Sequence, residues 1–325
     1  IKLWKYDPNH MVDQVNCLEA EWNIYTYIMP LFLSMKMSPN ILVPIESGVC
    51  SKPDFDKVMH NNLKGYEVVK YTITPLIQDS LVEFEQKCQA MDILSICFQV
   101  VYTLTMFAHM GLRHNDCHSN NVRIVPSTSD FKLAYHLKKK VVYCKTKHLA
   151  VINDFDRMGV EQPMKNVTRM TNPCTKTPDG FYCEGLNQCD RQLEGRRDLL
   201  IFMYYVYNML PQHYHVRKYV FSTILAPNAW ALQHFEKYIR MSSDGNIDYQ
   251  RSYSHEFLFI NLTDQEVLKY YRPIDDVLND DAFIGMFLGG KNHNHLADYE
   301  EFSFYNVSKK DLYDKYTQLV NQQKV

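Results

Sequence analysis

The chain has 325 residues, 46% hydrophobic content and a formal net charge of −2 at pH 7. This length suffices for one large core or for two lobes that share a cleft. The near-neutral charge gives no bulk attraction to nucleic acid or to membranes, and the longest apolar run, Leu199–Leu210, is too short to cross a bilayer. We therefore expect neither nucleic acid nor a membrane as a partner.

The nine cysteines are scattered, without the even count and regular spacing of a disulfide framework. This usage favours free thiols in a reducing compartment. The N-terminus lacks the basic region followed by an apolar stretch that marks a signal peptide. We therefore expect a cytoplasmic protein.

The first 80 residues alternate between predicted strands and one helix. We expect strands at residues 1–6, 40–45 and 66–74, because these segments are short, apolar and bounded by turn residues. Residues 13–29 have apolar positions at helical spacing, which predicts an amphipathic helix. Residues 75–80, which begin with a proline, are predicted to form a hinge before the next helix.

The middle of the chain contains the clearest helical pattern. Apolar residues recur at three- and four-residue spacing over residues 91–110, and Gly111 supplies a stop. Two short strands are predicted at 122–125 and 149–152. The residues between them form an insertion with a basic run, Lys138 to Lys140, which we interpret as a solvated strand edge or hairpin rather than a docking patch.

Two acidic segments flank this predicted strand pair. The first reads His114-Asn115-Asp116-Cys117-His118-Ser119-Asn120-Asn121, and the second reads Ile152-Asn153-Asp154-Phe155-Asp156. Asp116 is able to accept a proton from a hydroxyl group, and Asn121 and Asp154 offer the hard oxygen ligands that Mg²⁺ prefers. This combination suits phosphoryl transfer, which needs an aligned nucleophile and metal ions that hold charge on the phosphates.

The order and spacing of these residues resemble the catalytic loop and the metal-binding Asp-Phe-Gly motif of protein kinases. His114, Asp116 and Asn121 fall in register with the kinase loop. The resemblance implies that Asp116 is the catalytic base and that Asn121 and Asp154 bind Mg²⁺ and, through it, ATP. It also implies that residues 157–188, a polar and threonine-rich stretch, occupy the place of an activation segment.

Three further positions extend the resemblance over residues 1 to about 210. Lys2 stands where the kinase strand lysine binds phosphate, and Glu21 stands where the helix glutamate pairs with it, with Glu19 as a competing candidate. Asp198 opens an apolar segment, Leu199–Met203, that resembles the buried helix whose leading aspartate braces the catalytic loop. The resemblance therefore implies Lys2 and Glu21 as cofactor-binding residues.

The sequence departs from the kinase pattern at several places. Asn115 replaces the usual arginine, and Asp156 replaces the glycine of the Asp-Phe-Gly motif. The chain begins where a kinase would be in its third strand, and no Gly-x-Gly-x-x-Gly occurs in it. The expected fold is thus a kinase-like α+β fold with two lobes, a truncated small lobe at residues 1–76 and a mainly helical lobe at residues 77–325.

The residue at position 118 leaves open whether a protein or a small molecule receives the phosphoryl group. Protein kinases usually carry a lysine here, whereas small-molecule kinases resembling the aminoglycoside and choline kinase group carry His-x-Asp-x-His-x-x-Asn, which this loop also fits. An imidazole is able to hydrogen-bond a phosphate oxygen or Asp116. The altered glycine and the missing phosphate loop suggest a third possibility, a non-catalytic pseudokinase scaffold.

We expect ATP- and Mg²⁺-dependent phosphorylation of Ser or Thr hydroxyls on a protein substrate, with Asp116 and His118 as catalytic residues. In the way its motifs depart from the usual kinase residues, the chain resembles the divergent serine/threonine kinases of large DNA viruses. For such a protein the resemblance implies a location in the host cytoplasm or the virion.

Overall fold

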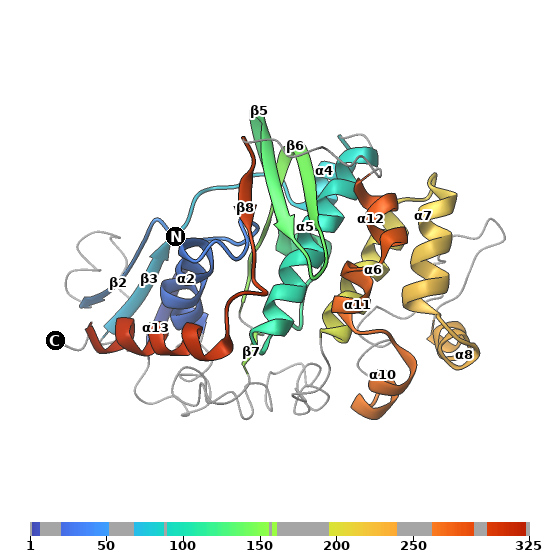
Figure 1. Ribbon diagram of the computed structural model, residues 1–325. Helices are drawn as coiled ribbons and strands as arrows, with labels where there is room; N and C mark the ends of the chain where they lie inside the picture. The colour runs from blue at the N-terminus through green and yellow to red at the C-terminus, as the bar shows by residue number, and fades with distance from the viewer. Residues whose placement is uncertain are drawn as a thin grey trace.

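The chain folds as a mixed α+β protein in which small sheets alternate with helices. A computed structural model describes residues 2–6, 21–51, 68–87, 90–155, 158–160, 195–238, 262–288 and 298–322. A small sheet, the helix that follows its first strand and the C-terminal helix stand at one end of the molecule, and most of the other helices stand at the opposite end (Figure 1). The long helix α5 and a β-hairpin lie between the two ends.

The first sheet contains the strands β1 (Lys2–Tyr6), β2 (Glu46–Ser51) and β3 (Val68–Ile73). The strands are antiparallel and follow the order β1-β3-β2, with Lys2 opposite Thr72. β1 and β3 confirm the predicted strands at 1–6 and 66–74. The middle strand β3 is therefore the one that is paired on both sides.

The helix that follows β1 in the described chain ends later than the sequence indicated. It is helical from Glu21, passes through a π-helical turn η1 (Ile24–Ile28), and continues as α2 (Met29–Ser34). The predicted end at residue 29 was wrong, because Pro30 lies in the first turn of α2, where a missing amide proton is tolerated. Trp22 ties the helix to the sheet by donating from Nε1 to the Tyr71 carbonyl oxygen at 3.2 Å.

The strand predicted at 40–45 forms only as an isolated bridge. Ile41 pairs in parallel with Ile152, and the regular strand begins at Glu46. Pro44 has no amide proton for a ladder, which explains the late start. Residues 40–42 instead exchange backbone hydrogen bonds with Ile152, since Ile152 donates to Asn40 and Leu42 donates to Ile152, each at 3.0 Å.

The helices α4 (Leu81–Glu85) and α5 (Ala90–His109) agree with the predicted ones. Ser80 and Glu83 form a capping box at the start of α4. Gly111 follows α5 with a φ of 77°, a left-handed conformation that suits glycine and ends the helix. Residues 91–109 have the length and apolar composition of a membrane span, but 78% of that stretch is buried inside the molecule, as in the core helix of a folded domain.

The centre of the molecule holds a long β-hairpin. β5 (Val122–His136) pairs with β6 (Val141–Ile152), and β8 (Glu300–Phe302) adds in parallel to β5. The sequence predicted two short strands around an insertion, whereas the inserted residues continue both strands. A register shift between Pro126 and Phe131 accommodates the polar residues in between.

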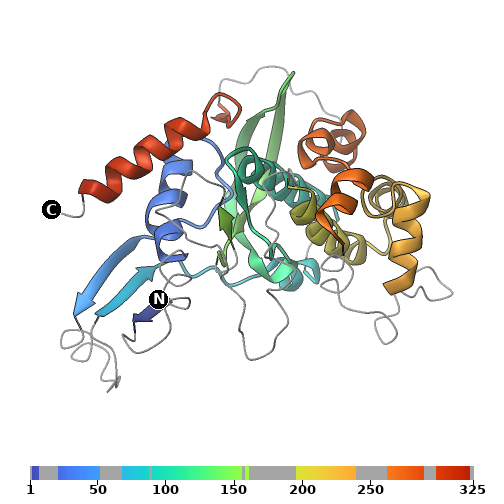
Figure 2. The same cartoon turned by 90° about the horizontal axis from the view of Figure 1, so that it is seen from below.

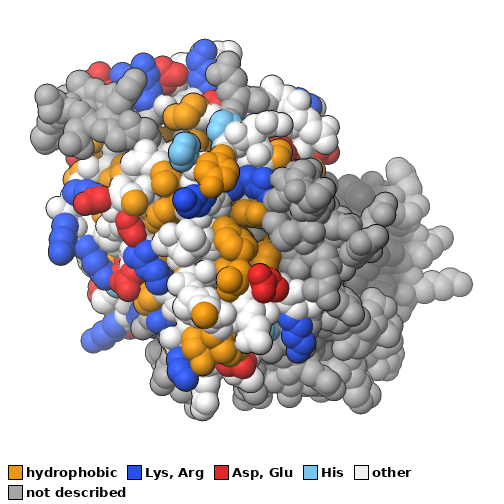
Figure 3. All heavy atoms as spheres, turned by 90° about the vertical axis from the view of Figure 1, so that its right-hand side faces the viewer, with side chains coloured by type: hydrophobic (Ala, Val, Ile, Leu, Met, Phe, Trp, Pro, Cys, Tyr) orange, Lys and Arg blue, Asp and Glu red, His pale blue; other side chains and the backbone are white. Residues whose placement is uncertain are grey.

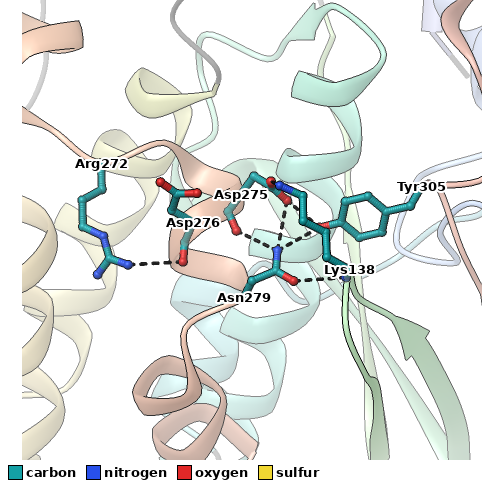
Figure 4. A network of polar contacts seen from close by, with 6 residues as sticks. All are labelled: Lys138, Arg272, Asp275, Asp276, Asn279 and Tyr305. Carbon is teal, nitrogen blue, oxygen red and sulfur yellow. Dashed lines mark hydrogen bonds and ion pairs between the residues drawn. The ribbon is translucent and has the colours of Figure 1, made fainter.

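The basic run forms the tip of this hairpin, as predicted. Lys138 pairs with Asp275 and Lys140 pairs with Asp281, so two of the three lysines bind the chain's own acidic residues. Asn279 accepts from the Lys138 amide at 3.1 Å and donates to Asp275 (Figure 4). The hairpin tip is therefore fastened to the helical side of the molecule.

The remaining elements are mainly helical, as expected for residues 77–325. They are β4 (Leu112–Arg113), β7 (Gly159–Val160), α6 (Arg196–Met209), α7 (Tyr214–Tyr219), η4 (Val220–Leu225), α8 (Ala229–Tyr238), α10 (Asp264–Tyr270), α11 (Ile274–Leu278), α12 (Asp281–Leu288) and α13 (Lys309–Gln322). On the side that carries α7 and α8, apolar side chains show between charged ones (Figure 3), and Tyr214 is 68% exposed there. The C-terminal helix α13 instead lies across α2 at the other end (Figure 2).

Candidate functional site

The candidate site forms where the central hairpin begins and ends. Asn121 directly precedes β5 and Asn153 directly follows β6, and the Asn153 amide donates to the Asn121 carbonyl oxygen at 3.0 Å. Because the two strands pair antiparallel, Val122 stands opposite Ile152. The hairpin thereby brings together two segments that the sequence separates by about thirty residues, and the residue before Asp154 contacts Asn121.

The side chain of Asn121 also fixes the position of Asp116. Its Nδ2 donates to the Asp116 carbonyl oxygen at 2.9 Å, and both residues are buried, at 6% and 8% exposure. The 3₁₀ turn η2 (Ser119–Asn121) brings the Asn121 side chain back to the Asp116 backbone. With its nitrogen engaged in this bond, the amide presents its oxygen as the atom for a further ligand.

His114 joins the two segments through its ring. Its Nδ1 accepts from the Asp116 amide at 3.3 Å, so the neutral ring carries its proton on Nε2, which lies 3.0 Å from the Asn153 carbonyl oxygen. The ring is fully buried and packs 5.5 Å from the ring of Phe155. His114 is therefore a structural bridge within the site.

Asp198 braces the 114–121 loop, as the sequence predicted. Its carboxylate is 1% exposed and accepts two backbone hydrogen bonds, from His114 at 2.9 Å and from Asn115 at 2.7 Å. It lies in the first turn of α6, where the helix dipole stabilises a negative charge. Asn115 adopts a φ of 64°, a conformation that asparagine tolerates better than most residues.

His118 lies against Asp116 at the edge of the site. Its Nδ1 accepts from the Asn120 amide at 3.2 Å, and its Nε2 lies 3.8 Å from Asp116 Oδ2. The neutral ring thus carries its proton on the nitrogen that faces the carboxylate. The predicted pair of Asp116 and His118 is brought together by the fold.

Cys117 lies in the same loop, and its side chain points away from solvent. It is fully buried, and burial together with the nearby Asp198 and Asp116 carboxylates raises the pKa of its thiol well above the usual range. A thiol held in the protonated form is a poor nucleophile and a poor metal ligand. Cys117 is therefore no candidate for a catalytic or metal-binding role in the loop.

Asp154 is held by a residue that the sequence marked only as apolar. The Asp154 amide donates to the hydroxyl of Tyr25 at 2.9 Å, and the Tyr25 ring lies 5.0 Å from that of Phe155. Asp154 itself has a φ of 62°. The apolar spacing placed Tyr25 in the core but gave no signal for its hydroxyl contact.

The structure describes only part of the predicted pair of Lys2 and Glu21. Glu21 lies at the start of the helix and is buried, at 2% exposure. Lys2 belongs to β1, but its side chain lies outside the described part of the structure, so its pairing with Glu21 stays a prediction. Asp156 and residues 161–188 of the predicted activation segment also lie outside the described residues.

A magnesium ion that is shared with a nucleotide stays a prediction for this site. Among the described residues, no group of three or more His, Cys, Asp or Glu side chains is placed to hold a metal ion. Mg²⁺ usually takes only one or two carboxylates from a protein and completes its shell with phosphates and water. Asp154 and Asn121 supply the number and kind of oxygen ligands that this mode requires.

A scan against protein-family models found no match to this chain, and no curated protein matches it either. The functional interpretation therefore depends on the residues of the site and their geometry.

Proposed function

We propose that this chain transfers a phosphoryl group from ATP·Mg to Ser or Thr hydroxyls of proteins. The observation that carries the proposal is the convergence of three residues at the base of the hairpin. Asn121 bonds the backbone of Asp116, and the amide of Asn153, the residue before Asp154, bonds the Asn121 carbonyl oxygen. This set supplies a hydroxyl-orienting group and two metal ligands.

The order of the elements supports the same proposal. An antiparallel sheet with one packed helix is followed by a linker, by α4 and α5, and then by the site and the helical remainder. Protein kinases have the same succession of a small lobe, a hinge and a large helical lobe. The sheet has the strand content expected for a truncated small lobe at residues 1–76.

Each residue of the site has a role in this proposal. Asp116 orients the acceptor hydroxyl and receives its proton. Asn121 and Asp154 hold Mg²⁺, which supplies charge neutralisation on the phosphates when it is bound. Asp198 keeps the loop amides in place, and His118, whose Nε2 lies 3.8 Å from Asp116 Oδ2, stands beside the acid, where its imidazole is able to hydrogen-bond a phosphate oxygen.

The position of His118 also favours a second candidate, a small-molecule kinase. Its Nε2 lies 3.8 Å from Asp116 Oδ2, so the fold uses both histidines of the His-x-Asp-x-His-x-x-Asn pattern around the acid. We rank this function second because Glu21 is buried at the start of a helix that packs on the sheet, as the protein-kinase resemblance requires. A pseudokinase scaffold would have no use for Asp116, Asn121 and Asp154 together.

Nucleotide binding tests the metal assignment. We expect Asp154→Asn to weaken Mg²⁺-dependent ATP binding by roughly a hundredfold, since loss of a charged metal ligand removes several kcal/mol of stabilisation. Isothermal titration with ATP, with and without Mg²⁺, measures this. Asp314→Asn, an exposed change on α13, is the matched control, and equal binding by the Asp154 variant and wild type would refute the assignment.

A further inference from the structure

The backbone of Asp154 is bonded by a tyrosine from another part of the chain. Asp154 has a φ of 62°, in a region that residues other than glycine rarely occupy. Such conformations persist where surrounding contacts hold them. One such contact is the hydrogen bond that the Asp154 amide donates to the Tyr25 hydroxyl at 2.9 Å.

Tyr25 is itself placed by an irregular helix. It lies in the π-helical turn η1, and it is 3% exposed. Single π turns within helices are rare and occur often at functional sites. Its ring lies 5.0 Å from Phe155, the residue that follows Asp154, so both the ring and the hydroxyl engage the metal-binding segment.

The C-terminal helix α13 packs against the same helical turn. The Tyr316 ring meets the Tyr27 ring edge-on at 5.8 Å, and both residues are buried. α13 contacts η1 and α2 along their length, and it lies across α2 in both views (Figures 1 and 2). The Ser303 amide also donates to the Lys36 carbonyl oxygen at 2.9 Å, just beyond the end of α2.

The same C-terminal segment also contacts the end of α5. The Tyr313 hydroxyl donates to the Met110 carbonyl oxygen at 3.0 Å, four residues before His114. Phe304 packs against Tyr102 of α5, with ring centroids 5.0 Å apart. Residues 303–316 therefore connect the helix that carries Tyr25 to the helix that leads into the 114–121 loop.

We propose that Tyr25 is a positioning residue for Asp154 and that α13 holds Tyr25 in place through the contact of Tyr316 with Tyr27. Displacement of α13 would loosen η1, remove the hydroxyl from the Asp154 amide and release the metal ligand from its left-handed conformation. For its consequence on nucleotide binding, this inference rests on the proposed function.

Hydrogen exchange at the Asp154 amide tests the inference without any ligand. Tyr25→Phe keeps the ring and removes the acceptor, so exchange of this amide should become about three- to tenfold faster, as the loss of one hydrogen bond predicts. Tyr316→Leu keeps apolar volume and removes the ring contact, and should have the same direction of effect. Gln318→Ala, an exposed change on the same helix, should leave exchange at the wild-type rate.

A double-mutant cycle separates action through Tyr25 from general loosening. If α13 acts through Tyr25, Tyr316→Leu should add little to the exchange rate once Tyr25→Phe is present. Additive effects of the two changes, or no effect of either one, would overturn the inference. Circular dichroism of each variant confirms that it is folded.

Titration with ATP·Mg tests the consequence for nucleotide binding. Tyr25→Phe and Tyr316→Leu should each weaken binding about three- to tenfold, again without additivity. If the wild-type chain fails to bind ATP·Mg, the proposed function fails while the exchange experiment still decides the inference. If the wild type binds and both variants bind equally well, the inference fails and the proposed function stands.

Discussion

One carboxylate determines the backbone of the 114–121 loop. Asp198 accepts from two successive amides, those of His114 and Asn115, and it is almost completely buried. Hydrogen bonds to charged acceptors are stronger than those between neutral groups, and a buried amide without its acceptor is costly. The left-handed φ of Asn115 is thus stabilised by a residue 83 positions away in the sequence.

Replacing this carboxylate should destabilise the protein measurably. We expect Asp198→Asn to lower the free energy of unfolding by about 1–3 kcal/mol, because the amide has only one acceptor oxygen for two buried donors. Urea denaturation followed by circular dichroism measures the difference. An Asp198→Asn protein as stable as wild type would show that the two bonds are not essential to the loop.

Among single residues, the sequence predicts those that are recognised by their place in a short motif. Asp116, Asn121, Asp154 and Asp198 were all recognisable, because a short motif or a helix start fixes their local setting. Tyr25 was recognisable only as an apolar helix position, since its hydroxyl meets an amide far along the chain. Contacts of that kind depend on how elements pack and leave no local signal.

Among the elements, the central hairpin does most to assemble the site. Its two ends carry Asn121 and Asn153, and a buried polar network fastens it to α5 and to residues 38–42. Asn40 donates to Gln99 Oε1 at 2.7 Å and to the Ala150 carbonyl oxygen at 2.9 Å, and it accepts from the Tyr135 hydroxyl at 2.9 Å. Fully satisfied networks of this kind specify one arrangement of the elements around them.

Loss of the Asn40 side chain should therefore affect the whole fold. We expect Asn40→Ala to lower the free energy of unfolding by roughly 2–4 kcal/mol, because it leaves the Tyr135 hydroxyl and the Ala150 carbonyl oxygen buried without this partner. The measurement is urea unfolding, with the slope checked for constancy. Asn306→Ala, at an exposed asparagine, should change stability by less than about 0.5 kcal/mol.

The sequence predicted the ends of this hairpin but missed its middle. The strands at 122–125 and 149–152 were apparent from their apolar runs. The residues Ser127, Thr128, Ser129 and Asp130 break the alternation, so the segment reads as an insertion by pattern alone. The register pairs none of these four residues with a residue of β6 and resumes with Phe131 opposite Thr146, because a bulge lets a strand continue past an unpaired stretch.

For the whole molecule, the order of elements was more predictable than their contacts. The sequence indicated strands, one helix, a linker and a mainly helical remainder, and the described residues follow that order. It gave no sign that α13 would return to the first helix or that β8 would join β5. Both are long-range contacts made by short or amphipathic elements, which fit many partners equally well.

The central claim, phosphoryl transfer to proteins, is tested most directly by following labelled γ-phosphate from ATP·Mg into a protein mixture. Wild type should transfer label to Ser or Thr, whereas Asp116→Ala should bind ATP·Mg normally and lose about a hundredfold or more of the transfer rate. Transfer at an unchanged rate by the variant would contradict the role of Asp116. Binding of ATP·Mg without transfer to any protein would contradict a protein acceptor and favour a small-molecule one.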